Sequence, residues 1–300
     1  MLHLRTVVVA LDLSPGSEAA LVRASDLAER SGATLHLLHA DVLFRSSGDG
    51  APDASPSSAL RVRVERFAAD ALGLDGPQAL DRLGPTVAVV RDVTAPAAVL
   101  RYAAEAGADL LVVGTHGRGG VARLLLGSVA EAVVAAAPCP VLTVPSRGAA
   151  PPPSPEAPVV VAVDFSERSR TALAAGYALA ELYGAAVELV HARRPARGAG
   201  ADSDAEVRER LAEFARSVPG PEPAALHVVR GAPSRAVPAW AAERGAGALV
   251  LGTHGRTGIA HAVIGSVAEA SLRRAPCPVL TLKQTERLGA APPRPTLASD

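Results

Sequence analysis

The sequence predicts an α/β protein made of two tandem domains, each an open parallel β-sheet with helices on both faces. Three observations lead to this prediction. The 300 residues are about twice the length of one typical domain, and 49% of them are hydrophobic. A long segment of the sequence occurs twice. Within each copy, short apolar runs alternate with helical segments, which is typical of parallel sheets.

The repeat is strongest at the end of each half. Residues 111–143 and 249–281 align without a gap, and about 22 of the 33 positions are identical. The beginnings also match, with VVVALDLS at 7–14 and VVVAVDFS at 159–166. The offset changes from 138 to 152 residues, so we expect 14 extra residues in the first half, around 44–58 and 73–85. The chain is therefore a tandem duplication.

The first half begins with Thr6–Leu11, a β-branched run that suits a strand buried on both faces. Ser14 can cap the helix that follows, Pro15 suits its first position, and Gly32 can end it. A loop rich in Gly, Pro, Ser and Asp is expected over 48–58. The other expected strands are 34–39, 87–90, 109–113 and 141–144, and the other expected helices are 59–72, 96–105 and 128–136.

The second half repeats this order of elements. Its expected strands are 159–163, 186–191, 226–229, 248–251 and 279–282. We expect the first domain to span residues 1–147 and the second 158–284. Residues 148–157, rich in Pro, Ala, Gly and Ser, are expected to form an extended linker, and 285–300 a disordered tail.

The composition excludes several classes of protein. The 30 basic and 30 acidic residues balance, so the chain has no overall positive charge for nucleic acid or an anionic membrane. The longest apolar stretch, about 132–145, is too short to span a membrane, and the first residues lack a signal-peptide layout. Two cysteines cannot form a disulfide framework. We therefore expect a cytoplasmic protein that binds neither nucleic acid nor membrane.

A glycine-rich loop carries the chemistry of each half. The first half has Gly114-Thr-His-Gly117, nine further residues, and then Gly127-Ser128; the second has Gly252-Thr-His-Gly255, nine residues, and Gly265-Ser266. Each loop leaves the carboxyl end of a strand and leads into the N-terminus of a helix. Ligands of open parallel sheets bind at this edge, and the unpaired N–H groups of a helix start suit phosphate.

The pattern G-x2-G-x9-G-[S/T], the Asp that ends the first strand and the final Pro-Cys-Pro-Val-Leu segment resemble the universal stress protein family. The resemblance is to the tandem form of its ATP-binding branch and extends over nearly all of both halves. It implies two Rossmann-like open parallel sheets of five strands, in order 3-2-1-4-5. It also implies ATP, together with Mg²⁺, lying across the first and fourth strands of each sheet.

The resemblance assigns roles to the matching residues. Asp12 and Asp164 would contact the ribose or the metal-side phosphates, and the backbone at Ala40 and Ala192 would recognise adenine. The glycines and the helix starts would hold the phosphates, with added charge-assisted bonds from arginine. The complete set of expected binding residues is Asp12, Ala40, Gly114, Gly117, Arg118, Gly119, Gly120, Arg123, Gly127, Ser128, Val129, Asp164, Ala192, Gly252, Gly255, Arg256, Gly258, Gly265, Ser266 and Val267. No catalytic and no metal-ligating residue is expected.

Several of these residues also have a purely structural interpretation. Asp12 can close a turn, and Ser128 and Ser266 are expected to cap their helices with or without a nucleotide. His39 and His191, at the ends of the second strands, are expected to be packing residues.

The loop histidines and the cysteines are open to similar interpretations. His116 and His254 are expected to tie down the loop rather than to act in catalysis. Cys139 and Cys277 are expected to be small buried residues, each in a Pro-Cys-Pro triplet. A disulfide between them stays open if the final strands pair across the halves, as the family suggests.

Three functions are compatible with these patterns. The preferred one is an ATP-binding stress-response or signalling module with little or slow hydrolysis. The second is an ATP-hydrolysing enzyme, against which the sequence offers no G-x4-G-K-[S/T] loop and a single lysine, Lys283. The third is a nucleotide-independent dimerising scaffold. A homodimer through the final strands and an unidentified signalling partner are also expected.

Overall fold

The computed structural model describes residues 4–42, 57–115, 126–146, 150–194, 203–253 and 264–283. Its strands are β1 (Thr6–Ala10), β2 (Thr34–Val42), β3 (Thr86–Asp92), β4 (Leu110–Gly114), β5 (Val141–Val144), β6 (Val159–Ala162), β7 (Val187–Arg193), β8 (Ala225–Arg230), β9 (Ala248–Gly252) and β10 (Val279–Leu282). Its helices are α1 (Pro15–Ser31), α2 (Ser57–Ala71), the 3₁₀ helix η1 (Pro77–Arg82), α3 (Ala95–Glu105), α4 (Ser128–Ala136), α5 (Glu167–Tyr183), α6 (Asp204–Arg216), α7 (Pro233–Glu243) and α8 (Ser266–Arg274).

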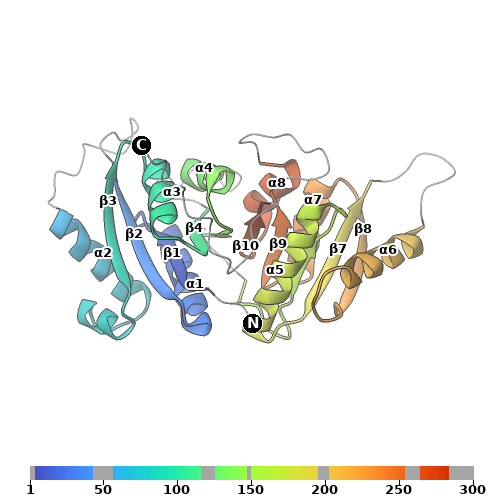
Figure 1. Ribbon diagram of the computed structural model, residues 1–300, viewed down its shortest axis with the longest axis horizontal. Coiled ribbons are helices and arrows are strands. Elements are labelled where there is room, and N and C mark those ends of the chain that lie inside the picture. Colours follow the sequence, from blue (N-terminus) through green and yellow to red (C-terminus); the bar gives the residue numbers. More distant parts are fainter. Residues whose placement is uncertain are drawn as a thin grey trace, which may run out of the picture.

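These strands form one sheet in the order β3-β2-β1-β4-β5-β10-β9-β6-β7-β8. Each half contributes five parallel strands in the order 3-2-1-4-5, which confirms the expected fold. Along the sheet, the strands of the second half follow in the reverse order, 5-4-1-2-3. Figure 1 shows the two halves side by side, the first coloured blue to green and the second yellow-green to red.

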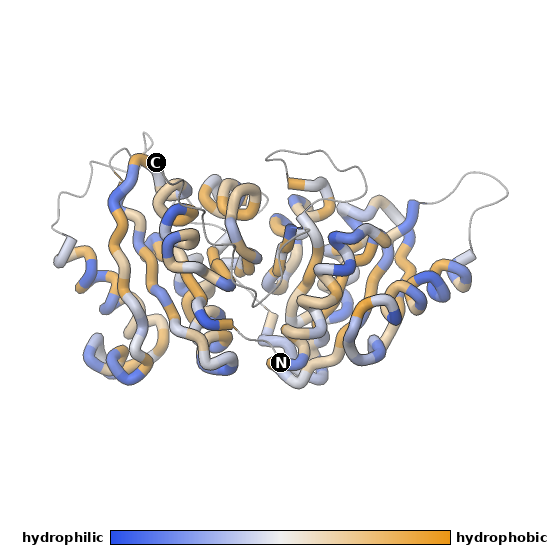
Figure 2. Tube along the Cα trace, in the orientation of Figure 1, coloured by the Kyte–Doolittle hydropathy of each residue, from blue (hydrophilic) through white to orange (hydrophobic). Residues whose placement is uncertain are grey.

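Helices cover both faces of the sheet because its strands are apolar on both sides. Val7 and Val9 belong to the core cluster beneath α1, α2, α5 and α6, whereas the intervening Val8 belongs to the cluster beneath α3, α4, α7 and α8. This alternation follows the two-residue period of a strand. Helix α6, at one end of the molecule, alternates hydrophilic and hydrophobic residues along its length (Figure 2), and Val207 and Leu211 on it are buried.

The first helix of the first half has the predicted ends, and its counterpart in the second half is closed in the same way. The Ser14 side chain accepts a hydrogen bond from the Ser17 backbone N–H and so caps α1, and Gly32 ends the helix in the left-handed conformation. Ser166 and Gly184 do the same for α5. The strands are less accurately predicted. β2 continues past His39 to Val42 because it pairs with the whole of β3, so Ala40 lies within the strand rather than after it.

The two halves join where β5 and β10 pair in antiparallel fashion, with Leu142 opposite Leu280. Threonine hydroxyls reinforce this seam symmetrically: Thr143 Oγ1 donates to the Val279 carbonyl and Thr281 Oγ1 to the Val141 carbonyl, both at 3.2 Å. Since all other pairs are parallel, the strands of one half run opposite to those of the other.

The seam bears on two expectations, a homodimer through the final strands and a disulfide between the two cysteines. Both final strands have a neighbour on each edge, β4 and β9 on their outer sides, so neither has an edge left for a second chain. A homodimer through the final strands stays a prediction, and within this sheet it would need a contact other than pairing at these edges. Cys139 and Cys277 lie buried beside this seam, and no disulfide joins them.

The expected extended linker is docked against the protein over the described residues 150–157. The Ala150 N–H donates to the Pro276 carbonyl at 3.0 Å, and Arg23 donates to the Ala150 carbonyl at 3.1 Å. Pro153 is buried against Gly247, where an added Cβ would lie 2.5 Å from the Pro153 Cα. In the first half the matching position is Asp109, a buried carboxylate that accepts hydrogen bonds from the N–H groups of Arg5 and Thr6.

One of the two expected insertions is visible. The 3₁₀ helix η1 lies within the segment 73–85 and has no counterpart between α6 and β8. The other expected insertion falls almost entirely on residues 43–56, outside the described residues. No helix in the described ranges is both long and apolar enough to cross a bilayer.

At one matched position of the second strand, the two halves carry titratable side chains of different kinds. In β2, His36 Nδ1 lies 2.9 Å from the Tyr102 hydroxyl. In β7, the matching Glu188 is buried and receives two guanidinium nitrogens of Arg244, at 2.7 and 2.9 Å, and His227 Nε2 at 3.0 Å. The first half therefore holds a titratable imidazole where the second holds a paired carboxylate.

We predict that this imidazole makes the stability of the first half depend on pH. Burial lowers the pKa of His36 below its ordinary value of 6.5, so below that pH the unfolded chain takes up a proton that the folded chain resists. The stabilising contribution is complete above pH 6.5 and is lost as the pH falls through the folded pKa. Denaturant unfolding of the wild type and His36→Gln between pH 7.5 and 5 should show a steeper loss in the wild type. Parallel curves would contradict this.

We also predict that Gly247→Ala destabilises the protein by about 1–3 kcal/mol, the usual range for overpacking. The new methyl group would meet backbone atoms of Pro153 and the Ala157 carbonyl oxygen at 2.5–2.7 Å, and neither can move without shifting the docked linker. Urea unfolding measures the change. Ala104→Ser, at an exposed position of α3, is the control and should change stability little. An unaffected Gly247→Ala protein would show that the linker is not held here.

Candidate functional site

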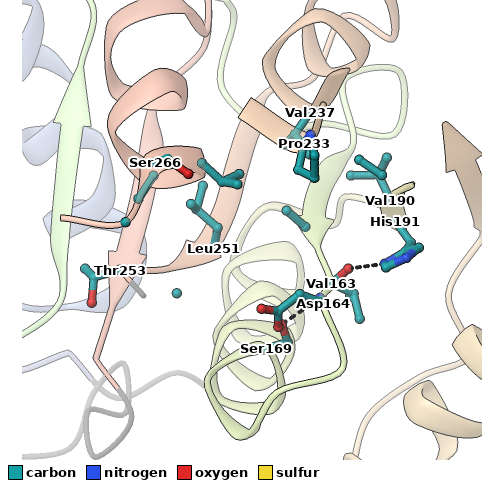
Figure 3. A pocket seen from close by; sticks show the side chains of 16 residues that line it. Val163, Asp164, Ser169, Val190, His191, Pro233, Val237, Leu251, Thr253 and Ser266 are labelled. Carbon is teal, nitrogen blue, oxygen red and sulfur yellow. Dashed lines mark hydrogen bonds between the residues drawn. The ribbon is translucent and has the colours of Figure 1, made fainter. Parts of the chain in front are cut away.

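A cavity of about 170 Å³ opens at the carboxyl ends of β6 and β9 in the second half (Figure 3). Its wall combines the ends of three strands with the first residues of α7 and α8. This is the edge of a parallel sheet at which ligands are expected, because the strand order reverses between β6 and β9.

The cavity brings together every predicted residue of the second half that the structure describes. These residues are Asp164, Ala192, Gly252, Gly265, Ser266 and Val267. Their counterparts in the first half are Asp12 after β1, Ala40 in β2, Gly114 at the end of β4, and Gly127, Ser128 and Val129 at the start of α4. The remaining predicted residues lie outside the described residues: Gly117, Arg118, Gly119, Gly120, Arg123, Gly255, Arg256 and Gly258. The loop histidines His116 and His254 also lie there.

Backbone hydrogen bonds close the base of each glycine-rich loop. The Gly127 N–H donates to the Thr115 carbonyl at 2.8 Å, and the Thr115 N–H donates to the Val144 carbonyl of β5 at 3.0 Å. In the second half, Gly265 and Thr253 make the same two bonds at 2.7 and 2.9 Å. The helix start is thereby held beside the end of the strand.

The start of α4 and of α8 offers backbone donors. The first intrahelical bonds run from Glu131 to Gly127 and from Glu269 to Gly265, so the three preceding N–H groups have no partner within their helix. The prediction that Ser128 and Ser266 cap these helices is wrong. The glycine before each serine occupies the cap position without a side-chain bond, and the serines are exposed in the first helical position. Their hydroxyl groups are therefore not used as caps.

The aspartate of each half lies in a tight turn. Asp12 Oδ1 accepts hydrogen bonds from the Ser14 N–H at 3.1 Å and the Ser14 hydroxyl at 2.5 Å. Asp164 Oδ1 accepts from the Ser166 N–H at 3.0 Å and the Ser169 hydroxyl at 2.7 Å. The turn-closing role weighed for Asp12 is confirmed, and contact with a ligand stays a prediction.

The residue after each aspartate is strained. Leu13 has a φ of 62° and Phe165 a φ of 65°, and these are the non-glycine residues with positive φ among those described. Such a conformation costs about 1–3 kcal/mol and persists where surrounding structure imposes it, often at functional sites. Its occurrence at the same position in both halves marks the turn as a shared feature of the site.

Two contacts at the site could not be derived from the sequence. His39 Nδ1 lies 2.7 Å from the Leu11 carbonyl oxygen, and His191 Nδ1 lies 2.7 Å from the Val163 carbonyl oxygen. The expectation of a structural role for both histidines is confirmed. The only signal in the sequence was that each histidine directly precedes the alanine assigned to adenine.

An aromatic cluster supports the second site. The Phe165 ring packs on the His191 ring with centroids 4.7 Å apart, and the Arg210 guanidinium of α6 lies 4.6 Å from the Phe165 centroid. The first half has Leu13 at the matching position. The described residues contain no group of three His, Cys, Asp or Glu side chains arranged to hold a metal ion.

Comparison with known proteins finds a protein family that matches both halves of the chain. The model of the universal stress protein family matches residues 3–145 and 157–283. A universal stress protein of Mycobacterium tuberculosis is 34% identical over 188 residues, which are 59% of this chain and 63% of that relative. The matched part thus spans less than two thirds of that relative. A second M. tuberculosis universal stress protein is 29% identical over 294 residues, 93% of this chain and 96% of its own length.

Two solved structures share the fold over both halves. A universal stress protein from Archaeoglobus fulgidus matches with a TM-score of 0.63 at 21% identity, covering 93% of this chain and 98% of that chain. A Pseudomonas aeruginosa protein described as a universal stress protein matches with a TM-score of 0.62 at 22% identity, covering 93% of both chains. At this level of identity the likeness concerns the fold.

We predict that Gly114→Ala damages the first site by displacing the start of α1. A Cβ at this position would lie 2.6 Å from the Gly16 carbonyl oxygen, and a backbone atom cannot move aside as a side chain can. The expected loss of unfolding free energy is about 1–3 kcal/mol, measured by denaturant titration. Glu131→Gln, an exposed position of α4, serves as control. A Gly114→Ala protein as stable as the wild type would contradict the close approach.

Proposed function

The chain belongs to the universal stress protein family, and we propose that it binds ATP at the carboxyl edge of each half and acts in the cytoplasm as a stress-response or signalling module with little or slow hydrolysis. The observation that carries this proposal is the cavity of the second half, which combines Asp164, the Ala192 strand end and the start of α8. The first half repeats the same elements.

The chemistry of the cavity suits the parts of ATP. Ala162, Val190 and Val237 give it an apolar side on which a base can pack. The backbone at Ala192 would supply polar contacts for adenine, and the Asp164 carboxylate would accept hydrogen bonds from ribose hydroxyls. An apolar cavity with a few polar groups at its rim is the usual form of a small-molecule site.

The phosphates would lie at the start of α8 and of α4. The N–H groups that have no partner within their helix, together with the positive end of the helix dipole, favour anions there. The exposed Ser266 and Ser128 hydroxyls, which are not used as caps, would add donors. In the same proposal, the side chains of Arg118 and Arg256 would add charge-assisted hydrogen bonds to the phosphates.

Magnesium would come with the nucleotide. Because the described residues hold no ready-made metal cluster, the ion would be held chiefly by phosphate oxygens, as Mg²⁺ often is. Mg²⁺ would neutralise part of the phosphate charge.

Binding rather than turnover is the favoured activity because the sequence has no G-x4-G-K-[S/T] loop, which would bring a lysine to the phosphates. Catalysis of phosphoryl transfer depends on metal and cationic groups placed around the phosphates. Lys283, the single lysine, follows β10 and donates a hydrogen bond to the Ala137 carbonyl at the end of α4. It therefore sits at the seam. A protein partner that responds to the bound state completes the proposed role.

Calorimetric titration of the nucleotide-free protein with MgATP tests the proposal. We expect two binding events per chain. Asp12→Asn and Asp164→Asn keep the Oδ1 acceptor of each turn but remove its charge, so each should weaken one event by about tenfold, the scale of one lost charge-assisted hydrogen bond. Asp81→Asn, on the exposed surface of η1, should leave both events unchanged.

Two results would overturn the proposal. A folded protein that binds no ATP would favour the nucleotide-independent scaffold. Steady-state hydrolysis at about 1 per second or faster, in the range of ordinary enzymes, would make the protein an ATPase.

A further inference from the structure

We infer that His39 and His191 are positioning residues of the two ATP sites, each holding the peptide from which the ligand-facing aspartate projects. The inference rests on the proposed function for its ligand and on the observed contacts for its geometry. Val163, Asp164 and His191 all line the cavity of the second half, so the holding contact forms part of the wall itself (Figure 3).

The imidazole continues the strand ladder at the point where the first strand ends. The Leu11 N–H donates to the Leu38 carbonyl at 2.8 Å, a regular bond to the neighbouring strand, and the Leu11 carbonyl accepts from His39 Nδ1 at 2.7 Å. In the second half, the Val163 N–H donates to the Val190 carbonyl at 2.9 Å and the Val163 carbonyl accepts from His191. A side-chain N–H thus donates to the carbonyl that would accept a backbone N–H of the neighbouring strand if the parallel ladder continued.

This bond acts on the aspartate through a single peptide unit. The carbonyl of Val163 and the N–H of Asp164 belong to one planar group. His191 holds the carbonyl side, and the Ser169 hydroxyl accepts from the Asp164 N–H at 3.0 Å while donating to Asp164 Oδ1 at 2.7 Å. With both sides of the plane held, the direction in which the Asp164 carboxylate leaves the backbone is set.

The strained turn explains why such a hold is needed. The residue after each aspartate keeps a left-handed backbone, with φ of 62° at Leu13 and 65° at Phe165, although neither is glycine. Such a conformation relaxes unless neighbouring bonds prevent it. The histidine bond lies two residues before it in both halves.

The imidazoles are themselves held in place. His39 is 5% exposed. His191 is packed beneath the ring of Phe165, which Arg210 and Phe214 cover in turn. A ring fixed in this way presents Nδ1 to the carbonyl, so Nδ1 must carry the proton in both halves.

The first experiment tests the hold without any nucleotide. Long-range ¹H–¹⁵N NMR of the ligand-free protein should show Nδ1 of His39 and His191 protonated at pH 7.5. An unprotonated Nδ1 at either residue would overturn the inference, whatever the protein binds.

The second experiment asks whether the hold acts through the aspartate. His191→Leu removes the donor and should weaken MgATP binding at the second site by about tenfold, while the first site of the same chain stays unchanged as an internal control. His191→Asn places an amide N–H near the position of Nδ1 and should restore most of the affinity. In the Asp164→Asn background, His191→Leu should cause little further loss, because the residue it positions has already lost its charge.

The outcomes separate this inference from the proposed function. A wild type that binds no ATP would defeat the proposed function, and the NMR result would then stand alone. Equal binding by folded His191→Leu and wild type would overturn the positioning role. So would an equal loss in His191→Leu and His191→Asn, or full additivity with Asp164→Asn. If His191→Leu does not fold, the Asn variant and its Asp164→Asn double mutant decide the question.

Discussion

The antiparallel pairing of β5 with β10 is the interaction on which the rest of this architecture depends. It turns two five-stranded sheets into one and gives both final strands a partner on each edge. Among the strands of the described residues, β3 and β8 are the edge strands. Arginine side chains cover part of the β3 edge, since Arg61 and Arg101 donate to the carbonyls of Val87 and Arg91. Exposed edges invite pairing with other chains, and these contacts reduce that risk.

Most of the fold could be predicted because the repeat and the hydrophobic periods agree with each other. Buried β-branched runs, the Ser14 cap and the Gly32 end are local signals, and the structure follows them. The docked linker could not be predicted. Its composition indicates an extended chain, and only the tertiary structure shows that Gly247 leaves room for Pro153 while the first half places Asp109 at the same position.

The candidate site was predictable to the level of residue types but not of contacts. The repeated glycines and aspartates indicated which strand ends matter, and the cavity gathers their described members. The prediction that the serines cap their helices was wrong because a glycine with an extended backbone can occupy the cap position. The serine then lies in the first helical position. The histidine bonds could not be predicted because their acceptor is a backbone carbonyl 28 residues away, and the sequence gives no side-chain signal for such a contact.

The seam within one chain also has a thermodynamic consequence. Two separate subunits dissociate when they are diluted, whereas two covalently joined halves meet at an effective concentration set by their connection and not by the amount of protein in the cell. The two halves of this chain therefore stay paired at any expression level. They are also free to diverge in sequence. At one matched position, for example, the first half has the imidazole of His36 and the second half has the Glu188 carboxylate, which pairs with Arg244. A homodimer of single domains, with identical halves, does not have that freedom.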